Sequence, residues 1–212
     1  MFVIKKFWED PYLTELDAKV TSVDGDHVTV DQTIAFAFSG GQESDTGTIG
    51  GYKILKAEKR DQQIVYQLEG HNLSVEDAVL IKIDWERRYR LMRLHFAAEI
   101  VLELVTQRFN HPEKIGAHIS EDKARVDFYW QGNISQIFDS LQTEIETLVK
   151  SNLPIRSDFS DTLNEVRFWE IEGFAKVPCG GTHPKRTGEV GKLLLKRNNI
   201  GKGKERIEIY LK

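Results

Sequence analysis

Four side chains in this sequence have the types and spacing of metal ligands. Cys179, the only cysteine, stands four residues before His183, across two glycines and a threonine. His95 and Glu99 also stand four residues apart, in a segment with helical periodicity, so they share one face of a helix. Thiolate, imidazole and carboxylate groups all bind Zn²⁺. A pair on a rigid helix and a pair on a glycine turn therefore indicate a tetrahedral zinc site.

Each pair taken alone also has a simpler interpretation. A histidine and a glutamate at this spacing often form only a hydrogen bond or an ion pair on a helix surface. A lone cysteine is commonly a small buried apolar residue. The presence of both pairs in one chain is what favours a shared site. A catalytic zinc would also need one coordination position open to water or substrate.

Composition and charge indicate an ordinary globular protein of the cytoplasm. The 212 residues fit one large domain or two small ones, with 40% hydrophobic and 29% charged residues. No apolar run approaches the ~20 residues of a membrane helix, and we expect no secretory signal and no membrane partner. A single cysteine cannot form an internal disulfide, which is compatible with a reducing compartment. The net charge of -4 means that a nucleic-acid partner would need a local basic surface.

The elements that position the four side chains fall into two zones. Up to about residue 84 the sequence is typical of short strands, with Asp24-Gly25 as a hairpin turn signal. This pattern favours a small β-barrel-like domain, which we place over residues 1–86.

The second zone mixes helices with alternating strands. Apolar residues recur at helical spacing from Arg88 to Phe109, and a second helix is expected after Gly132-Asn133. The strands around these helices include RVDFYW, VRFWEI and RIEIYL, which alternate in polarity as antiparallel strands do. We therefore expect an α+β fold, with an antiparallel-sheet domain containing two long helices over residues 87–212.

The residues around the cysteine resemble a known family. The segments CGGTHPKRTGEVG and GKGKERIEIYL are similar to the CGGTH and RRIE motifs of the alanyl-tRNA editing module. That module occurs within alanyl-tRNA synthetase and as the free-standing AlaX proteins, and threonyl-tRNA synthetase carries a relative. SGGQESDTGTIG resembles the family's glycine-rich motif, and RLHFAAEIVLELV falls where the family has a His-x-x-x-His helix. The resemblance spans about residues 36–211, and the length suits the medium-length AlaX form.

The resemblance implies a trans-editing hydrolase that removes serine or glycine wrongly attached to tRNA(Ala), by ester hydrolysis beside a bound zinc ion. Cys179, His183 and His95 match the family's ligands, whereas Glu99 stands at the position of its second helix histidine. Three roles are open for Glu99. It could be an oxygen ligand of zinc, a general base over a water molecule, or part of a metal-free set that positions water.

Glycine-rich and basic segments are expected to hold the substrate. The residues expected to contact it are Gly40, Gly41, Gln42, Gly180, Gly181, Thr182, Lys185 and Arg186. Backbone N–H groups of Gly180, Gly181 and Thr182 are candidate oxyanion donors. The GGQ segment would form a second wall unless it is a simple β-turn. The basic stretch from Lys185 to Arg206 suits the phosphates of a tRNA acceptor end, although charge runs are usually solvated faces. We expect no DNA partner.

A second basic cluster and one aromatic residue also bear on which substrate the protein binds. The cluster comprises Arg87, Arg88, Arg90 and Arg93, where the first helix begins. Phe96 replaces a small hydroxyl residue of the family and points either into the core or at the pocket wall, where it would affect the choice of amino acid. Two other functions are therefore considered. They are a repurposed hydrolase of a small aminoacyl ester or amide, and a tRNA-binding module without catalysis.

Overall fold

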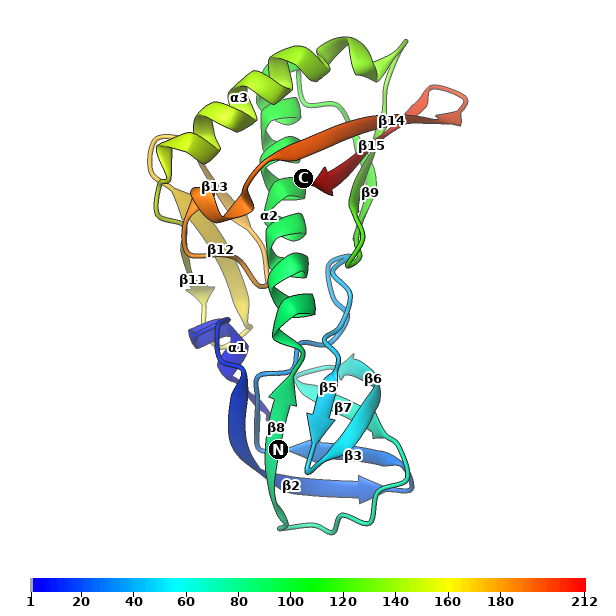
Figure 1. Ribbon diagram of the computed structural model, residues 1–212, viewed down its shortest axis with the longest axis vertical. Helices are drawn as coiled ribbons and strands as arrows, with labels where there is room; N and C mark the ends of the chain where they lie inside the picture. The colour runs from blue at the N-terminus through cyan, green and yellow to red at the C-terminus, as the bar shows by residue number, and fades with distance from the viewer. Residues whose placement is uncertain (1) are drawn as a thin grey trace. The chain divides into compact units, whose positions relative to one another are not determined.

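The computed structural model describes residues 2–212, which divide into two compact units (Figure 1). The first unit comprises the chain up to Ser39 together with Glu43–Tyr89. The second comprises Gly40–Gln42 together with Arg90–Lys212. Within the described residues, no helix combines the length and the apolar character needed to cross a membrane.

Six strands of the first unit close into a barrel in the order β2-β3-β7-β6-β5-β8. Their bounds are β2 Glu15–Asp24, β3 His27–Val30, β5 Gly47–Ile49, β6 Tyr52–Arg60, β7 Gln63–Leu68 and β8 Ala78–Ile83. The short elements β1 (Ile4–Lys5), α1 (Lys6–Glu9) and β4 (Gln32–Thr33) complete the unit. In β7, Ile64, Tyr66 and Leu68 are buried while their neighbours are half-exposed, because successive side chains point to opposite faces of a strand.

A buried ion pair holds the glycine-rich segment of the first unit. Arg88 is fully buried and donates through Nε to the Asp45 carboxylate at 2.8 Å, and a second guanidinium nitrogen contacts the same carboxylate. The guanidinium also donates to the carbonyl oxygens of Ile34 at 2.6 Å and Pro11 at 3.0 Å. The Phe36 N–H donates to Asp45 at 2.6 Å. The expectation that Arg88 belongs to a tRNA-binding cluster is therefore wrong, because its guanidinium is fully buried and donates to groups inside the first unit.

The second unit is an antiparallel α+β structure, which confirms that part of the fold prediction. A four-stranded sheet has the order β14-β15-β10-β9, and a three-stranded sheet has the order β11-β12-β13. The bounds are β9 Lys114–Ile119, β10 Ala124–Tyr129, β11 Arg156–Asp161, β12 Val166–Ile171, β13 Ala175–Pro178, β14 Leu193–Gly201 and β15 Lys204–Leu211. Every pairing within these two sheets is antiparallel.

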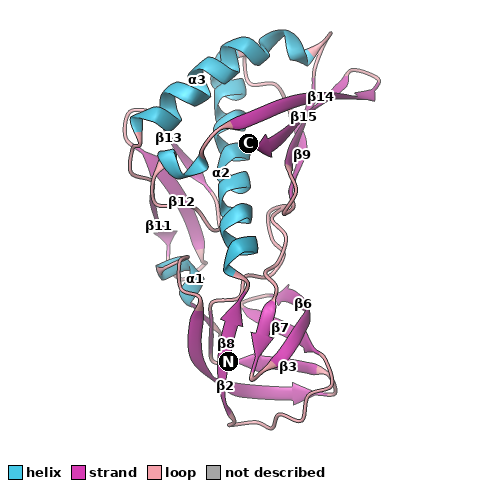
Figure 2. Ribbon diagram, viewed as in Figure 1, coloured by secondary structure: helices cyan, strands magenta, loops and turns pink. Residues whose placement is uncertain are grey.

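The long helix α2 (Trp85–Arg108) supplies most of the core of the second unit. Its part from Arg90 onward lies between the two sheets (Figures 1 and 2). The buried apolar residues along it are Leu91, Met92, Leu94, Phe96, Ala97, Ala98, Ile100, Val101, Leu104 and Val105. They surround the helix rather than forming one stripe, as expected for a helix covered on several sides. Among the described residues on this part of the helix, His95 is the one charged or titratable residue that is buried.

The second helix begins where the sequence predicts. The Asn133 side chain accepts a hydrogen bond from the Ser135 N–H at 2.9 Å and caps a short 3₁₀ turn, η1 (Ile134–Ile137). This turn leads into α3 (Phe138–Ser151), which ends at Asn152 in the left-handed conformation, with φ of 49°. A second 3₁₀ turn, η2 (Thr187–Val190), follows the cysteine loop.

We predict that the Arg88–Asp45 pair is essential to the first unit. Arg88→Met leaves the Asp45 carboxylate buried without its cation, and this should lower the free energy of unfolding by about 3–5 kcal/mol. Denaturant unfolding followed by circular dichroism measures the change. Glu76→Gln is the control, because it breaks an exposed ion pair with Lys19 and should cost less than about 1 kcal/mol. Equal losses in the two variants would contradict the assigned role of the buried pair.

Candidate active site and metal centre

The four predicted ligands come together in the second unit, between α2 and the loop after β13. The Cys179 Sγ lies 3.3 Å from His183 Nε2 and 3.6 Å from His95 Nε2. The ligand atoms of these three residues all lie within 4.8 Å of one another. The Glu99 Oε1 lies 3.3 Å from His95 Nε2 and 3.5 Å from Cys179 Sγ. The structure thus joins two pairs that are about 80 residues apart in sequence.

These separations fit a tetrahedrally coordinated ion. Zinc binds nitrogen and oxygen at about 2.0–2.2 Å and sulfur at about 2.3 Å, so neighbouring donors of a tetrahedron lie roughly 3.3–3.6 Å apart. The contacts of the Cys179 sulfur with His183, Glu99 and His95 measure 3.3, 3.5 and 3.6 Å. One soft sulfur, two imidazole nitrogens and one carboxylate oxygen form a donor set suited to Zn²⁺. His95, Cys179 and His183 therefore lie close enough together to hold a metal ion, and Glu99 contacts two of them.

Burial and neighbouring charges polarise the cluster. Burial alone lowers the pKa of His95, but the Cys179 sulfur and the Glu99 carboxylate raise it to about 10 overall. Burial raises the pKa of Glu99, whereas the hydrogen bond and charge of His95 lower it to about 2 overall. The pKa of His183 falls to about 3, through burial first and then the charge of His95. The Cys179 sulfur and the Glu99 carboxylate thus favour positive charge at the position of His95.

Two further side chains contact the candidate ligands. The Ser157 Oγ lies 3.0 Å from Nδ1 of His183, on the side of the ring opposite the sulfur contact. The Trp169 indole N–H donates to the Glu99 Oε2 at 3.3 Å. Such partners fix the orientation of metal ligands. Sequence reasoning missed both residues, because neither lies in a recognisable motif and only the pairing of β11 with β12 brings them to the site.

Close packing of the cysteine loop on α2 requires a glycine. A Cβ atom at Gly181 would lie 2.0 Å from Cε1 and 2.5 Å from Nδ1 of His95. At Gly180, a Cβ atom would meet nothing within 4 Å. Within residues 2–212, the buried Nδ1 of His95 has no hydrogen-bond partner. The backbone at Gly181 therefore fixes how closely the loop approaches the imidazole.

The GGQ segment clamps the same loop. Gln42 is fully buried, donates through Nε2 to the Thr182 Oγ1 at 2.9 Å, and accepts the Thr182 N–H at 3.2 Å. The Ile119 N–H donates to the Gly41 carbonyl at 2.8 Å, which joins the segment to the end of β9. Gly41 has φ of 90°, and a Cβ there would lie 2.7 Å from the Ala117 carbonyl oxygen. The expectation for Thr182 is therefore corrected, because its N–H holds Gln42 and is not an oxyanion donor.

The predicted basic residues near the loop have structural contacts. The Arg186 guanidinium donates to the Asn152 carbonyl at the end of α3, and its N–H donates to Glu189 at 2.9 Å. The Lys185 carbonyl accepts the Ile155 N–H at 2.9 Å. Arg93 donates to the Val190 carbonyl at 3.1 Å. These guanidinium groups secure loops, and a substrate-binding role for Lys185 and Arg186 stays a prediction.

Phe96 belongs to the core, which is one of the two alternatives considered for it. It is fully buried, with ring centroids 5.1 Å from Trp169 and 5.6 Å from His183. Both neighbouring rings meet it edge to face. Any effect of Phe96 on the site therefore passes through the packing of these two rings.

The face of the four-stranded sheet that is turned away from the core carries basic and aromatic side chains. In β15 the core residues Ile207 and Ile209 alternate with Arg206, Glu208 and Tyr210. The charged residues of this outer face are Lys123, Arg125, Lys196, Lys204 and Arg206, against the acidic Asp127 and Glu208.

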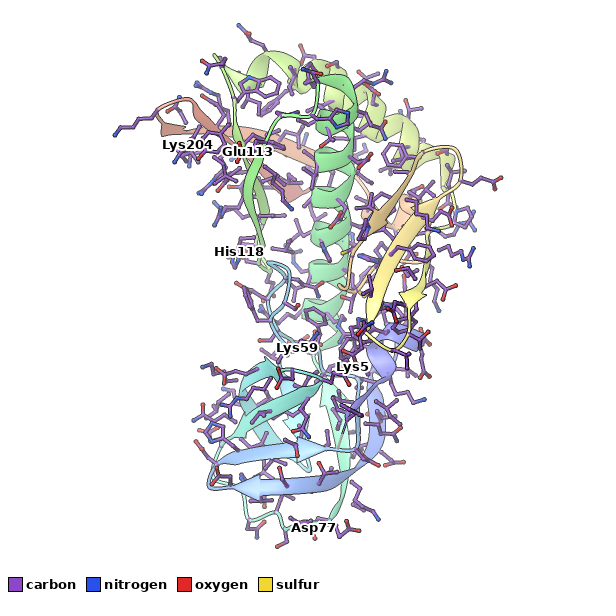
Figure 3. The ribbon with its side chains drawn as sticks, turned by 180° about the vertical axis from the view of Figure 1, so that it is seen from behind. Lys5, Lys59, Asp77, Glu113, His118 and Lys204 are labelled. Carbon is purple, nitrogen blue, oxygen red and sulfur yellow. The ribbon has the colours of Figure 1, made fainter. Side chains whose placement is uncertain are left out.

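Two tyrosines of this outer face lie beneath lysines. The Lys196 Nζ lies 4.9 Å from the ring centroid of Tyr210, and the Lys204 Nζ lies 5.4 Å from that of Tyr129. Tyr129 is 45% exposed. Lys204 lies at the start of β15, beside the turn of the β14–β15 hairpin (Figure 3). The face therefore has a net positive charge and accessible aromatic surface.

Comparisons with known proteins point to one family. Residues 166–208 match the family described as "Threonyl and Alanyl tRNA synthetase second additional domain". The chain is 30% identical to the Alanyl-tRNA editing protein AlaX-M of Pyrococcus horikoshii, over 98% of this chain and 97% of that protein. It is 30% identical to the AlaX-M protein of Methanosarcina barkeri, over 97% of each. It is also 30% identical to the alanine–tRNA ligase of Methanococcus aeolicus, over 95% of this chain and 25% of the ligase.

We predict that Gly181→Ala disrupts the candidate metal centre whereas Gly180→Ala does not. The added methyl group at position 181 must displace the His95 ring, so affinity for Zn²⁺ should fall by at least about tenfold. Competition with a chromophoric chelator measures this affinity. The methyl group at position 180 enters open space and should leave the affinity within about twofold of wild type. Equal affinities in the two variants would contradict the described packing.

Proposed function

The chain belongs to the family of AlaX-type alanyl-tRNA editing proteins, and from this premise we propose that it hydrolyses the ester bond of tRNA(Ala) misacylated with serine or glycine. The observation that carries the proposal is the cluster of His95, Cys179 and His183, whose ligand atoms lie within 4.8 Å of one another. Glu99 contacts two of these residues, His95 and Cys179. The relatives of matching length are named alanyl-tRNA editing proteins, which supports the same reaction.

Zinc is the proposed cofactor, held by the four residues of the cluster. A bound Zn²⁺ ion would supply Lewis-acid activation of a water molecule or of the ester carbonyl. We assign Glu99 as a ligand rather than a general base. Its Oε2 accepts the Trp169 indole N–H, and its Oε1 faces His95 and Cys179. Both oxygens are thus directed to the protein and the cluster, which leaves neither oriented toward an attacking water.

The protein groups contribute mainly by positioning the ester. An aminoacyl ester is already reactive, so alignment and stabilisation of the oxyanion supply most of what the reaction needs. The N–H groups of Gly180 and Gly181 are the proposed oxyanion donors. The Gln42–Thr182 clamp and the contact of Gly181 with His95 hold this turn in place beside the cluster. Preorganised donors of this kind avoid reorganisation during the reaction.

The acceptor end of tRNA is the proposed partner, and the outer face of the sheet β14-β15-β10-β9 is its proposed binding surface. RNA-binding sheets combine basic side chains for phosphates with aromatic rings on which bases stack. On this face Asp127 contacts Arg206 at 2.7 Å, and Glu208 contacts Lys123 at 2.6 Å. The remaining positive charge includes Lys196 and Lys204, which lie over the tyrosine rings. The edge strand β9 pairs with Gln42 at Ile119, and Gln42 is hydrogen-bonded to Thr182 of the cysteine loop. Gln42 therefore links this sheet to the cysteine loop.

Deacylation by the purified protein tests the proposed reaction. We expect rapid loss of serine from seryl-tRNA(Ala), with correctly charged alanyl-tRNA(Ala) spared. Cys179→Ala and His95→Ala each remove a proposed ligand, and each should lower the rate by about 100-fold or more. Circular dichroism should be unchanged. Normal turnover in both variants would overturn the site assignment.

The same assay separates the alternatives. Hydrolysis of a free seryl ester that does not respond to tRNA would favour a repurposed small-ester hydrolase. Salt-sensitive tRNA binding without any deacylation would favour a tRNA-binding module.

We predict that charge reversal on the outer face of the sheet weakens tRNA binding without slowing the chemical step. The double variant Lys196→Glu and Lys204→Glu should raise KM by about tenfold and leave kcat unchanged, because it removes phosphate contacts only. The dependence of log K on log[salt] should become less steep by about one unit per lost contact. Lys150→Glu on α3 is the control, since its exposed side chain lies on another element. A double variant that behaves like the control would exclude this surface.

A further inference from the structure

We propose that Trp169 is the positioning residue of the fourth metal ligand. Its indole N–H holds one oxygen of Glu99 and thereby directs the other oxygen to the Cys-His-His group. The inference rests on the metal binding proposed above, and it assigns a role to a residue outside the four ligands.

The indole ring is fixed in place by its surroundings. Trp169 is fully buried in β12, with its backbone paired to Ser157 on β11 and to Val177 on β13. The Phe96 ring meets it edge to face at a centroid distance of 5.1 Å, and the Phe174 ring lies nearly parallel to it at 6.4 Å. The position of the N–H is therefore set by packing in the core and not by the contact with Glu99.

The carboxylate, in contrast, needs an external constraint. A glutamate side chain has three rotatable bonds, and its terminal torsion is broad. The Glu99 side chain is also 16% exposed, against 5% for the His95 side chain. A buried indole N–H requires an acceptor, and Oε2 of Glu99 at 3.3 Å supplies it.

The two carboxylate oxygens consequently have separate roles. Oε2 is occupied by the indole, whereas Oε1 lies 3.3 Å from His95 Nε2 and 3.5 Å from Cys179 Sγ. This arrangement presents a single oxygen to the cluster and so favours monodentate binding in a tetrahedral geometry. A carboxylate free to rotate could present both oxygens and raise the coordination number.

Trp169→Phe tests the inference, because it removes the N–H and keeps an aromatic ring in the core. Affinity for Zn²⁺, measured by chelator competition, should fall by about 10–100-fold, the usual effect of losing a hydrogen-bond partner of a metal ligand. The visible absorption of the Co²⁺-substituted protein, which reports tetrahedral geometry, should weaken. Trp130→Phe is the matched control. Trp130 packs edge to face on Phe109 in the same unit and has no contact with the four ligands among those described.

Variants at position 99 separate positioning from packing. In the Glu99→Ala background, Trp169→Phe should cause no further loss of metal affinity, because the acceptor on which the indole acts is gone. An equal loss in both backgrounds would show a merely structural role and overturn the inference. So would an unchanged affinity of Trp169→Phe in the wild-type background. Failure of the wild-type chain to bind Zn²⁺ or Co²⁺ would overturn the metal proposal itself, and with it the role of Trp169.

Discussion

The site depends on the close approach of the Gly181 backbone to the His95 ring. The side chains of Cys179 and His183 extend from a loop, and loops alone do not hold ligands to a fraction of an ångström. Here the loop is pressed on a buried helix at a distance that no Cβ atom would allow. The helix is in turn surrounded by apolar side chains from both sheets. The positions of the four side chains are thus fixed by packing in the core, because Gly181 allows the loop to contact a helix that the core holds in place.

Much of the placement of the candidate ligands could be predicted from the sequence. The spacing of His95 and Glu99 on a helical segment fixes their common face, and the glycines beside Cys179 indicate a turn. The sequence pattern also predicts the antiparallel strands and a helical segment after Asn133, which is η1 leading into α3. These predictions succeed because they depend on local periodicity and turn chemistry, which act over a few residues.

The remaining features depend on contacts between distant segments. Arg88, Arg93 and Arg186 form parts of basic clusters in the sequence, yet each donates to carbonyl oxygens of other segments in the structure. The charge pattern of a sequence does not distinguish an arginine that binds phosphate from one that donates to a buried carbonyl oxygen, because the guanidinium offers the same N–H donors to both acceptors. The role of Trp169 could not be predicted from the sequence for a related reason. A tryptophan in an apolar strand is normally core, and its polar N–H gains meaning only when its acceptor is known.

The division of the chain into two units limits how the second unit can be produced as a separate fragment. Gly40–Gln42 belongs to the second unit although the residues on both sides of it belong to the first. A fragment that begins at Arg90 would contain all four ligands, but it would lack the glutamine that holds Thr182. The structural border therefore cannot be reproduced by a single cut in the coding sequence. A shortened version that begins at Arg90 would leave Thr182 without its two hydrogen bonds to Gln42.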